Sequence, residues 1–455
     1  MPKDKHAPVA IIGAGPWGLS TAYHLVQQGY DDITVFERSW KIPSPYSAGN
    51  DLNKIVRSQY DTDFYTELGL EAIEGWKTPD FSPYYHQTGH LVTVSGQASL
   101  KATQHHEEAF EYVTKHPVLS RGVQPINTRA QFQEYAWQLS GPLKGFKGYF
   151  NRLEGYAHSA NALRGIYTLL AGRGVKFLLG PEIGHVVELI YDSPLVSSSS
   201  RSSRCTGVRT RDGKAHAVQT TICALGAYGA SLIPLLGSFN VARCWSVAHI
   251  QLTQRECDIL RGLPVVNVRD LGFYFEPDPE TRLLKLCPLG AGFSNPDTKT
   301  GISLPPATDT PLLHDYIPLE DEQKLRTLLC ETLTWLADRP FINNKLCWFS
   351  DTCDSEYCID FVPGTGGSLV VLSGDSGHGF KMMPIFGKWV VELLDRGEQQ
   401  IPRWRWRDTA TEGSKDNDWG NDVSWRFGEA KTINEIVEER KNQNCGAKAS
   451  SRSRL

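Results

Sequence analysis

Three glycines and one acid near the start of the chain have the spacing of a dinucleotide site. Gly13, Gly15 and Gly18 follow the apolar run 9–12, and Glu37 ends the next apolar run. The first glycine allows a tight turn, the second lets backbone N–H groups approach a diphosphate, and the third lets the following helix pack closely. Glu37 is placed to accept hydrogen bonds from a ribose. The pattern predicts a bound dinucleotide and leaves open whether it is NAD or FAD.

The ten cysteines follow neither a metal-site pattern nor a disulfide framework. Their spacing is irregular, and the first of them is Cys205. Cys353 and Cys358 lie near Cys347, but no Cys-x-x-Cys pair or histidine cluster accompanies them, so we predict no metal. A chain with this cysteine usage is expected in a reducing compartment inside the cell.

The segments around the glycine turn read as a strand, a helix and a second strand. The first apolar run forms a short buried strand, a helix begins near Trp17, and residues 33–36 form the next strand. A buried strand from Thr220 also turns at glycine, and the strand 368–373 feeds the glycine-rich loop 374–381. These elements are typical of a doubly wound sheet with a ligand at its strand ends.

Between these elements the pattern changes to that of a second domain. Residues 84–95 have strand composition, and helical segments follow to about residue 140. Alternation over 245–286 predicts antiparallel strands, and a leucine-rich helix spans about 320–337. The predicted organisation comprises nucleotide-binding segments at 8–83, 156–235 and 341–400, substrate-domain segments at 84–155 and 236–340, and a C-terminal extension with a flexible tail at 401–455.

Length and composition are those of an ordinary globular enzyme. The chain has 455 residues, of which 40% are hydrophobic and 22% charged, with a net charge of −4. A chain of this length is too long to form a single compact core, which predicts two or three domains. With nearly balanced charge and no apolar run of about 20 residues, we expect neither a nucleic-acid nor a membrane partner.

The last three residues resemble a targeting signal. Ser453, Arg454 and Leu455 form a conservative variant of the Ser-Lys-Leu peroxisomal address and follow a polar tail. We therefore expect recognition by the peroxisomal import receptor and a peroxisomal location. Without that signal the protein is expected in the cytoplasm.

Several separate segments resemble one enzyme family. The glycine turn, the run 47–60, and the segments 148–152, 336–341, 347–352 and 373–381 are similar to those of flavoprotein amine oxidases of the monomeric sarcosine oxidase type. Within that family the chain resembles the fungal fructosyl amino acid oxidases (amadoriases) and related L-pipecolate, saccharopine and amino acid oxidases. The resemblance covers about residues 8 to 408. It implies a monomeric α/β protein with a Rossmann-like FAD-binding domain of the GR2 type, interleaved with an α+β substrate domain that has a mixed or antiparallel sheet.

The resemblance also makes the dinucleotide FAD and implies how it is held. Relatives link FAD through its 8α carbon to a cysteine in the segment matched by Cys347 and Trp348. The alternative is an ordinary buried cysteine, and Cys353 lies close enough to compete for the assignment. The cofactor contacts that we expect are Gly13, Ala14, Gly15, Trp17, Gly18, Glu37, Arg38, Ser47, Asn53, Lys54, Val187, Cys347, Asp375, Gly377, His378, Gly379, Phe380 and Lys381.

Three basic residues match the family's chemistry. Lys285 matches the lysine that activates dioxygen, where a buried cation would stabilise superoxide. Arg57 and Lys381 match the pair that binds the substrate carboxylate, the arginine through two parallel hydrogen bonds and the lysine as a point charge. The alternative for each is a surface charge. His378 lies near Lys381 in sequence, where it could tune that lysine or serve the structure alone.

One segment departs from the amadoriase pattern. An acidic pair that helps to recognise sugar hydroxyls usually follows the Lys-x-Cys segment, whereas Cys287 is followed by Pro288, Leu289 and Gly290. Sugar hydroxyls without hydrogen-bond partners should bind poorly, which argues against deglycation. An aromatic or cyclic substrate pocket could be formed instead, and its expected walls are Tyr60, Tyr274, Phe275 and Trp348, with Tyr274 also a candidate catalytic residue.

The resulting prediction is an oxidase of the C–N bond in a secondary amine that carries a carboxylate. Candidate substrates are N-alkyl amino acids, cyclic imino acids and saccharopine-like compounds, with dioxygen reduced to hydrogen peroxide. Relatives in fungal secondary metabolism form isoquinolines from N-methyl tyrosine derivatives, which is a further option. The alternatives are a fructosyl amino acid oxidase, a nicotinamide-dependent dehydrogenase, and a flavin-binding protein without catalysis.

Overall fold

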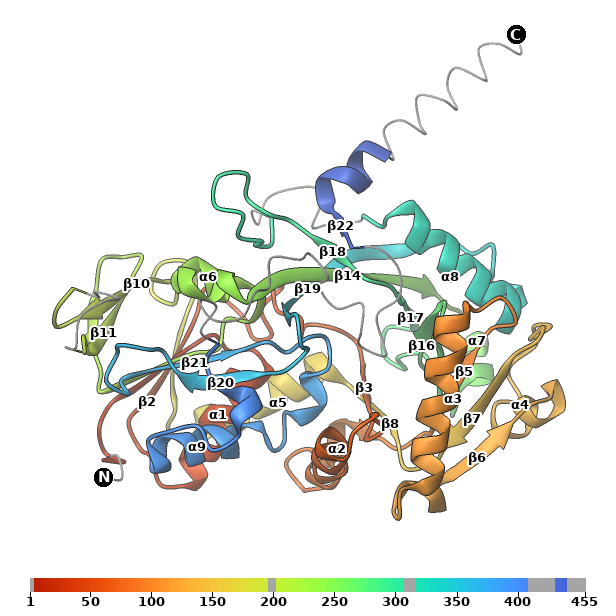
Figure 1. Cartoon of the computed structure of the whole chain (residues 1–455), viewed down its shortest axis with the longest axis horizontal. Helices are drawn as coiled ribbons and strands as arrows, with labels where there is room; N and C mark the ends of the chain where they lie inside the picture. The colour runs from red at the N-terminus through yellow and green to blue at the C-terminus, as the bar shows by residue number, and fades with distance from the viewer. Residues whose placement is uncertain (1–3, 195–201, 307–315, 408–429, 440–455) are drawn as a thin grey trace, which may run out of the picture.

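The computed structural model describes residues 4–194, 202–306, 316–407 and 430–439. Two large sheets lie side by side, each with helices packed against it (Figure 1). The predicted targeting tripeptide, Ser453, Arg454 and Leu455, and most of the tail from 401 lie outside the described residues. In the described part of the chain, no helix is both long enough and apolar enough to cross a membrane.

The smaller of the two large sheets is mostly parallel and Rossmann-like. Its six strands, in spatial order, are β20 (Cys358–Phe361), β21 (Leu369–Ser373), β13 (Thr220–Cys223), β1 (Val9–Ile12), β2 (Ile33–Glu37) and β9 (Lys176–Leu179). Every neighbouring pair is parallel except β20 with β21. Strands β1, β13 and β21 are buried throughout, as a parallel sheet covered on both faces requires.

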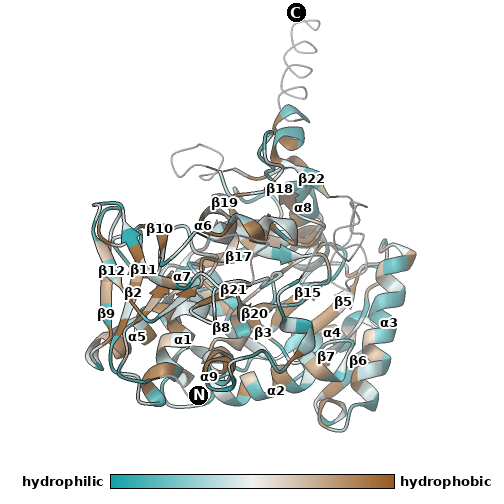
Figure 2. Ribbon diagram, turned by 60° about the vertical axis from the view of Figure 1, so that its left-hand side comes forward, coloured by the Kyte–Doolittle hydropathy of each residue, from teal (hydrophilic) through white to brown (hydrophobic). Residues whose placement is uncertain are grey.

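Helices cover one face of this sheet and a small antiparallel sheet packs near the other. The helices are α1 (Pro16–Gln27), α5 (Ser159–Gly172) and α9 (Phe386–Arg396), with α1 in contact with both others. The three-stranded sheet contains β10 (Val186–Tyr191), β11 (Cys205–Thr210) and β12 (Ala215–Ala217). In Figure 2 the hydrophobic colour follows the inner strands, where the core lies.

The larger sheet is mixed. Its strands, in spatial order, are β22 (Lys431–Thr432), β18 (Phe293–Ser294), β14 (Asn240–Gln251), β17 (Leu283–Pro288), β16 (Gly272–Tyr274), β15 (Val265–Val268), β5 (His90–Val94), β7 (Lys147–Asn151) and β6 (Val123–Ile126), and β19 (Ile342–Thr352) also pairs with β14. The helices around it are α3 (Leu100–Lys115), α4 (Arg129–Tyr135), α7 (Gln254–Leu260) and α8 (Leu319–Thr332). Leucines of α8 pack on one face of β15, β16 and β17, which leaves the opposite face for the site.

A fourth sheet, also three-stranded, and two further helices complete the strands and α-helices of the described residues. The strands are β3 (Lys54–Val56), β8 (Gly155–Ala157) and β4 (Tyr85–His86), and the helices are α2 (Asp63–Trp76) and the single turn α6 (Gly229–Leu232). The predicted helical stretch up to residue 140 was wrong in one part, because β6 interrupts it at Val123–Ile126 and pairs with β7. The predicted domain boundaries stay a prediction: the 341–400 segment contributes β19 to the larger sheet and β20 and β21 to the smaller one.

Candidate active site

A cavity of about 500 Å³ lies between the two large sheets. Its walls come from the glycine turn, the loop before β3, strand β19, the glycine-rich loop after β21, and the free face of the larger sheet. The predicted cofactor residues that line it are Gly13, Gly15, Trp17, Glu37, Arg38, Ser47, Lys54, Val187, Cys347, Asp375, Gly377, His378, Gly379, Phe380 and Lys381. The predicted catalytic residues Arg57 and Lys285 line it as well. Segments separated by more than 300 residues therefore meet at one site.

The glycine turn has the geometry that its sequence predicts. Gly13 has a φ of +103°, and a Cβ there would lie 2.4 Å from the carbonyl oxygen of Ala224. A Cβ on Gly18 would lie 1.9 Å from the Gly13 carbonyl oxygen, so only glycine lets α1 pack this closely. At Gly15, by contrast, a Cβ would find its nearest neighbour, Ser47 Oγ, at 3.6 Å. The second glycine thus faces open space at the start of α1, where a diphosphate is stabilised.

The nucleotide end of the cavity is polar and partly unsatisfied. The Glu37 carboxylate accepts hydrogen bonds from the backbone N–H of Ala14 at 3.2 Å and of Ser39 at 3.0 Å, while burial raises its pKa. The Arg38 guanidinium lies over the rings of Tyr46 and Tyr228, at 4.7 and 4.1 Å from their centroids. One buried Arg38 nitrogen has no hydrogen-bond partner among the described residues. A buried donor of this kind suits a polar ligand such as the adenosine portion of a dinucleotide.

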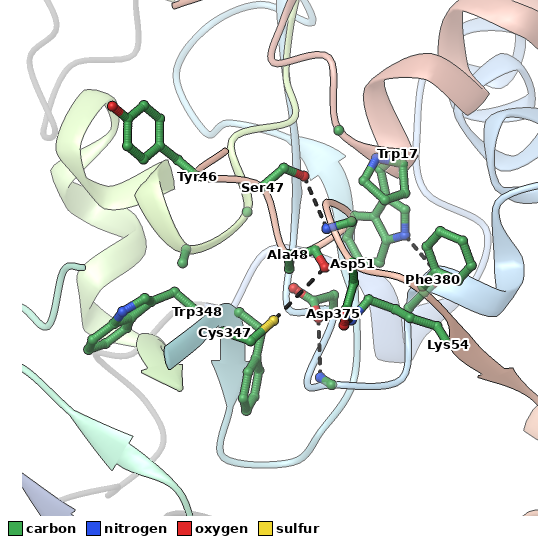
Figure 3. A pocket seen from close by; sticks show the side chains of 18 of the residues that line it. Trp17, Tyr46, Ser47, Ala48, Asp51, Lys54, Cys347, Trp348, Asp375 and Phe380 are labelled. Atoms are coloured by element: carbon green, nitrogen blue, oxygen red, sulfur yellow. Dashed lines mark hydrogen bonds and ion pairs between the residues drawn. The ribbon is translucent and has the colours of Figure 1, made fainter. Parts of the chain in front are cut away.

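Cys347 lies on β19 with its sulfur 3.9 Å from the carbonyl oxygen of Ala48 (Figure 3). The Trp348 indole extends from the same strand in another direction, and its Nε1 has no partner among the described residues. The Cys347 thiol is partly exposed to the cavity, unlike Cys358, which is fully buried. A cofactor within the cavity can therefore reach the Cys347 sulfur.

The glycine-rich loop after β21 is held against the first helix. Trp17 Nε1 donates to the carbonyl oxygen of Gly379 at 3.3 Å, and a Cβ on Gly379 would meet the Trp17 ring at 2.6 Å. Asp375 accepts hydrogen bonds from the backbone N–H of Ser350 at 3.0 Å and of Gly377 at 3.2 Å, and burial raises its pKa to about 6. The loop is thus fixed at both ends against other parts of the cavity wall.

Lys285 belongs to a cluster of three lysines around one buried carboxylate. Its Nζ donates to Asp51 Oδ2 at 2.6 Å and to the backbone oxygen of Asn53 at 2.6 Å. Lys54 contacts the same Asp51 oxygen at 3.0 Å, and Lys345 lies 3.9 Å from the other one. Burial opposes ionisation of Asp51, yet the lysine charges hold its pKa well below its usual range. Lys285 is 2% exposed, so it is a buried lysine and not a surface one, while its role in the reaction stays a prediction.

Lys381 has neutral partners instead. Its Nζ donates to the Tyr60 hydroxyl and to the carbonyl oxygen of His378, both at 2.6 Å. Burial lowers the pKa of Lys381 well below its usual value, and the nearby charge of Arg57 adds to this effect. The Arg57 guanidinium lies 4.4 Å from the Tyr60 ring centroid. The Tyr60 ring therefore brings together the arginine and lysine that the sequence predicts to act jointly.

His378 supports this arrangement. Its Nδ1 lies 2.9 Å from the Tyr60 hydroxyl, and its Nε2 lies 2.9 Å from the carbonyl oxygen of Ser355. The ring also stacks on Tyr357, with centroids 4.9 Å apart. Both ring nitrogens thus contact the protein, and the imidazole positions Tyr60.

Four residues that the sequence predicts to contact the cofactor or the substrate do not line the cavity. Ala14, Gly18 and Asn53 do not line the cavity themselves, although each supports a group that does. Tyr274 is buried in the core beneath α8, because side chains alternate along β16 and Phe273 takes the cavity side. The structure therefore contradicts a direct catalytic contact by Tyr274.

The expected aromatic wall also needs correction. Of its four predicted members, Tyr60, Tyr274, Phe275 and Trp348, only Trp348 lines the cavity, whereas Trp245, Phe273, Phe349 and Phe380 line it without having been expected as that wall. Leu289, from the segment that departs from the amadoriase pattern, does line the cavity and gives it an apolar surface there. Sequence reasoning also missed Asp51, although it lies inside the segment 47–60 that carries the resemblance.

Comparisons with known proteins identify the family of the chain. The family model described as FAD dependent oxidoreductase matches residues 8–393. The L-saccharopine oxidase of Schizosaccharomyces pombe is 30% identical over 432 residues, which cover 92% of this chain and 95% of that protein. An amino acid oxidase of Aspergillus flavus is 26% identical, over 87% of this chain and 93% of its own length.

A solved structure shows the same fold. The deglycating fructosamine oxidase (amadoriase II) of Aspergillus fumigatus superposes with a TM-score of 0.83 at 31% identity, over 95% of this chain and 96% of that one. The predicted α/β class, with its Rossmann-like cofactor domain, is confirmed. The family match also resolves the choice of dinucleotide that the glycine turn left open. The chain belongs to the FAD dependent oxidoreductase family, and its cofactor is FAD.

Proposed function

We propose that the protein is an FAD-dependent oxidase of secondary amines that carry a carboxylate. N-alkyl amino acids, cyclic imino acids and saccharopine-like compounds belong to this class. The observation that carries the proposal is the joint position of Arg57 and Lys381 around Tyr60, in the cavity that Cys347 and Lys285 also line. A carboxylate clamp without a redox group would make only a binding protein, and a redox group without a clamp would not select amino acids.

The protein's own groups bind, orient and shield the substrate. The Arg57 fork and the Lys381 ammonium hold the carboxylate, which fixes the adjacent amine and carbon within the cavity. The amine has to be deprotonated, so that its nitrogen lone pair is available. FAD, held along the glycine turn, Glu37 and the loop 374–381, would supply the two-electron redox chemistry, in which the amine is oxidised to an imine and dioxygen is reduced to hydrogen peroxide.

Lys285 provides the positive charge for the oxygen half of the reaction. Reduction of dioxygen develops negative charge, and a fixed cation in a site that excludes water stabilises it without reorganisation. The pair with Asp51 holds the ammonium in place, and Lys54 and Lys345 keep that carboxylate ionised. The cluster therefore supports an oxidase rather than a nicotinamide-dependent dehydrogenase.

Cys347 is proposed to link the cofactor covalently through a thioether to the 8α carbon. Its sulfur lines the cavity, whereas Cys353 is not among the lining residues. Mass analysis of the unfolded protein should show an added flavin that is lost in Cys347→Ser and kept in Cys353→Ser. An adduct retained in Cys347→Ser would assign the link to another residue.

A peroxide-coupled screen tests the function. The panel is sarcosine, pipecolate, saccharopine, fructosyl amino acids and N-methyl tyrosine derivatives, each repeated without oxygen while flavin absorbance is followed. We expect at least one carboxylate-bearing amine to bleach the flavin and to yield peroxide. A flavin that stays oxidised with every amine would leave only a binding role.

A deglycating fructosyl amino acid oxidase is the second candidate, favoured by the amadoriase fold match. The Leu289 side chain argues against it, because it presents apolar surface where sugar hydroxyls need partners. In the same screen we therefore expect fructosyl amino acids to react much more slowly than N-alkyl amino acids. Faster oxidation of the fructosyl compounds would reverse the order of the two candidates.

Peroxisomal delivery stays a prediction from Ser453, Arg454 and Leu455. Formation of hydrogen peroxide is the chemical reason for that location. A fluorescent protein fused to the amino end, with and without the tripeptide, tests it by co-localisation. The expected result is import only when the tripeptide is present.

A further inference from the structure

Positive charge exceeds negative charge along the cavity. Among the described residues, seven Lys and Arg side chains line it, but only three Asp and Glu side chains do. Those three acids are engaged elsewhere: Glu37 at the glycine turn, Asp51 with the lysine cluster, and Asp375 with the backbone N–H groups of Ser350 and Gly377. None of the three comes from the strands of the larger sheet that form the opposite wall.

That wall contributes a buried arginine, Arg269, directly after β15. Side chains alternate along this strand, so Val266 and Val268 pack in the core beneath α8 while Asn267 and Arg269 line the cavity. The backbone N–H of Arg269 donates to the carbonyl oxygen of Thr93 at 2.8 Å, which continues the pairing of β15 with β5. Arg269 is therefore presented by sheet backbone rather than by a loose loop.

Arg269 lies close to the carboxylate clamp and deep in the protein. It is only 7% exposed, and burial together with the charge of Arg57 lowers its pKa. Arg57 and Arg269 thus bring two positive charges to the wall of one cavity, and their mutual repulsion disfavours both charges together. An anionic group bound in the cavity near both guanidinium groups would be attracted by each of them. The planar guanidinium suits a carboxylate, which it can bind through two parallel hydrogen bonds.

The residues beside Arg269 are polar and already oriented. His90 Nδ1 lies 2.7 Å from Glu154 Oε2, and Asn267 Nδ2 lies 3.2 Å from His90 Nε2. Glu154 also accepts from the backbone N–H groups of Ser58 at 2.9 Å and of Gln59 at 2.8 Å. His90 and Asn267 line the cavity, so this network forms a rigid polar surface beside the arginine.

We propose that the substrate carries a second carboxylate and that Arg269 binds it. This proposal rests on the proposed oxidation of carboxylate-bearing amines. Arg57 and Lys381 hold the carboxylate next to the amine, while Arg269 holds the one at the end of the substrate side chain. The substrate class is then an N-substituted amino dicarboxylate. Arg269 selects this class over N-alkyl amino acids with neutral side chains.

Acid and amide pairs of equal shape test the proposal. N-methyl-L-glutamate and N-methyl-L-glutamine differ in one charge, and the aspartate and 2-aminoadipate pairs extend the comparison to shorter and longer side chains. The ratio of kcat/KM for acid over amide should be at least about tenfold in one pair, because a hydrogen-bonded charge pair is formed or lost. In Arg269→Met that ratio should fall to about one, and Arg269→Lys should keep part of it.

Controls separate this proposal from the one on which it rests. Arg211→Met removes the charge of an exposed residue that lines the same cavity near His185, on which Arg38 also acts, and should leave the acid-to-amide ratio unchanged. Flavin absorbance and the thermal midpoint show whether each variant is folded. If neither these compounds nor any other carboxylate-bearing amine of the screen bleaches the flavin, the proposed function fails. If acids and amides react equally well in the original protein, or if Arg269→Met keeps the preference, the role of Arg269 alone is overturned.

Discussion

Two lysines line the same cavity and are both almost fully buried, but their partners differ. Lys285 donates to the Asp51 carboxylate, whereas Lys381 donates to the Tyr60 hydroxyl and to a backbone carbonyl. Lys285 thus has a counter-charge in the protein itself. The pKa of Lys381 is lowered by burial and by Arg57, so its ammonium is the less stable of the two until an anion arrives.

This difference teaches how one cavity can serve two half-reactions. A cation that must act on a neutral molecule such as dioxygen needs its charge fixed in advance, and an ion pair provides this. A cation that must bind a carboxylate gains most from binding when no protein carboxylate already occupies it. We therefore expect changes at Lys285 to affect oxygen and changes at Lys381 to affect substrate.

The largest expected effect is on reoxidation in Lys285→Met. Removal of the fixed cation should slow the reaction of reduced flavin with dioxygen by at least about 100-fold, the size seen when one preorganised electrostatic contact is lost. Substrate reduction under anaerobic conditions should change far less. Stopped-flow measurement of the two half-reactions checks this.

Lys345→Met is the matched control for that prediction. Lys345 belongs to the same cluster but lies 3.9 Å from Asp51 and is 33% exposed along its side chain. Its loss should therefore slow reoxidation much less than the loss of Lys285. Comparable losses in both half-reactions of Lys285→Met would reject the division of labour between the two lysines.

Lys381→Met should weaken substrate binding by about 10- to 100-fold, because one of the two cations of the clamp is lost. Methionine fills a similar volume without charge, so the cavity wall is kept. The dissociation constant comes from the substrate dependence of anaerobic flavin bleaching. Reoxidation in this variant should stay within about twofold of the original, and a large oxygen effect would contradict the comparison.

Substrate affinity should fall as the pH rises through the depressed pKa of Lys381. Carboxylates bind the protonated ammonium, so affinity is complete below that pKa and declines by up to about tenfold per pH unit above it. A thioether analogue such as methylthioacetate isolates this effect, since its sulfur does not titrate. Titration of the flavin spectrum should show the decline in the original protein and in Lys285→Met. A decline that persists in Lys381→Met would assign it to another group.

Much of the cofactor domain could be predicted from sequence because its signals are local. The strand, turn and helix around Gly13 lie within a few residues of one another, and each glycine has a steric reason to be glycine. The larger sheet was harder. Its strand β15 pairs parallel with β5 on one side and antiparallel with β16 on the other, and β6 joins an edge within a stretch that reads as helical. Such pairings depend on contacts distant in sequence.

The candidate site divides in the same way. Arg57, Lys285 and Lys381 were found through family segments, and the structure brings them to one cavity. Asp51 was missed because its bond to Lys285 joins positions 234 residues apart, which no local pattern reveals. Tyr274 was misassigned because a three-residue strand is too short for its sequence alone to indicate which side chains face the core.

Tyr60→Phe should have the smallest effect and bears directly on why Lys381 differs from Lys285. The Tyr60 hydroxyl accepts from Lys381 Nζ at 2.6 Å and so stabilises the ammonium, while the ring also packs against Arg57. Phenylalanine keeps the ring and removes one hydrogen bond, so binding of the thioether should weaken by about threefold and its decline should begin at a lower pH. Tyr357→Phe is the control, because the Tyr357 hydroxyl contacts His378 Nδ1 at 3.2 Å and donates to the His378 carbonyl oxygen at 3.3 Å, but in the described part of the chain it does not bond to Lys381 directly. An equal shift in the pH of the decline in both variants would mean that Tyr60 acts through His378. A shift confined to Tyr60→Phe would show that the neutral Tyr60 oxygen stabilises the Lys381 ammonium, in part as the Asp51 carboxylate stabilises Lys285.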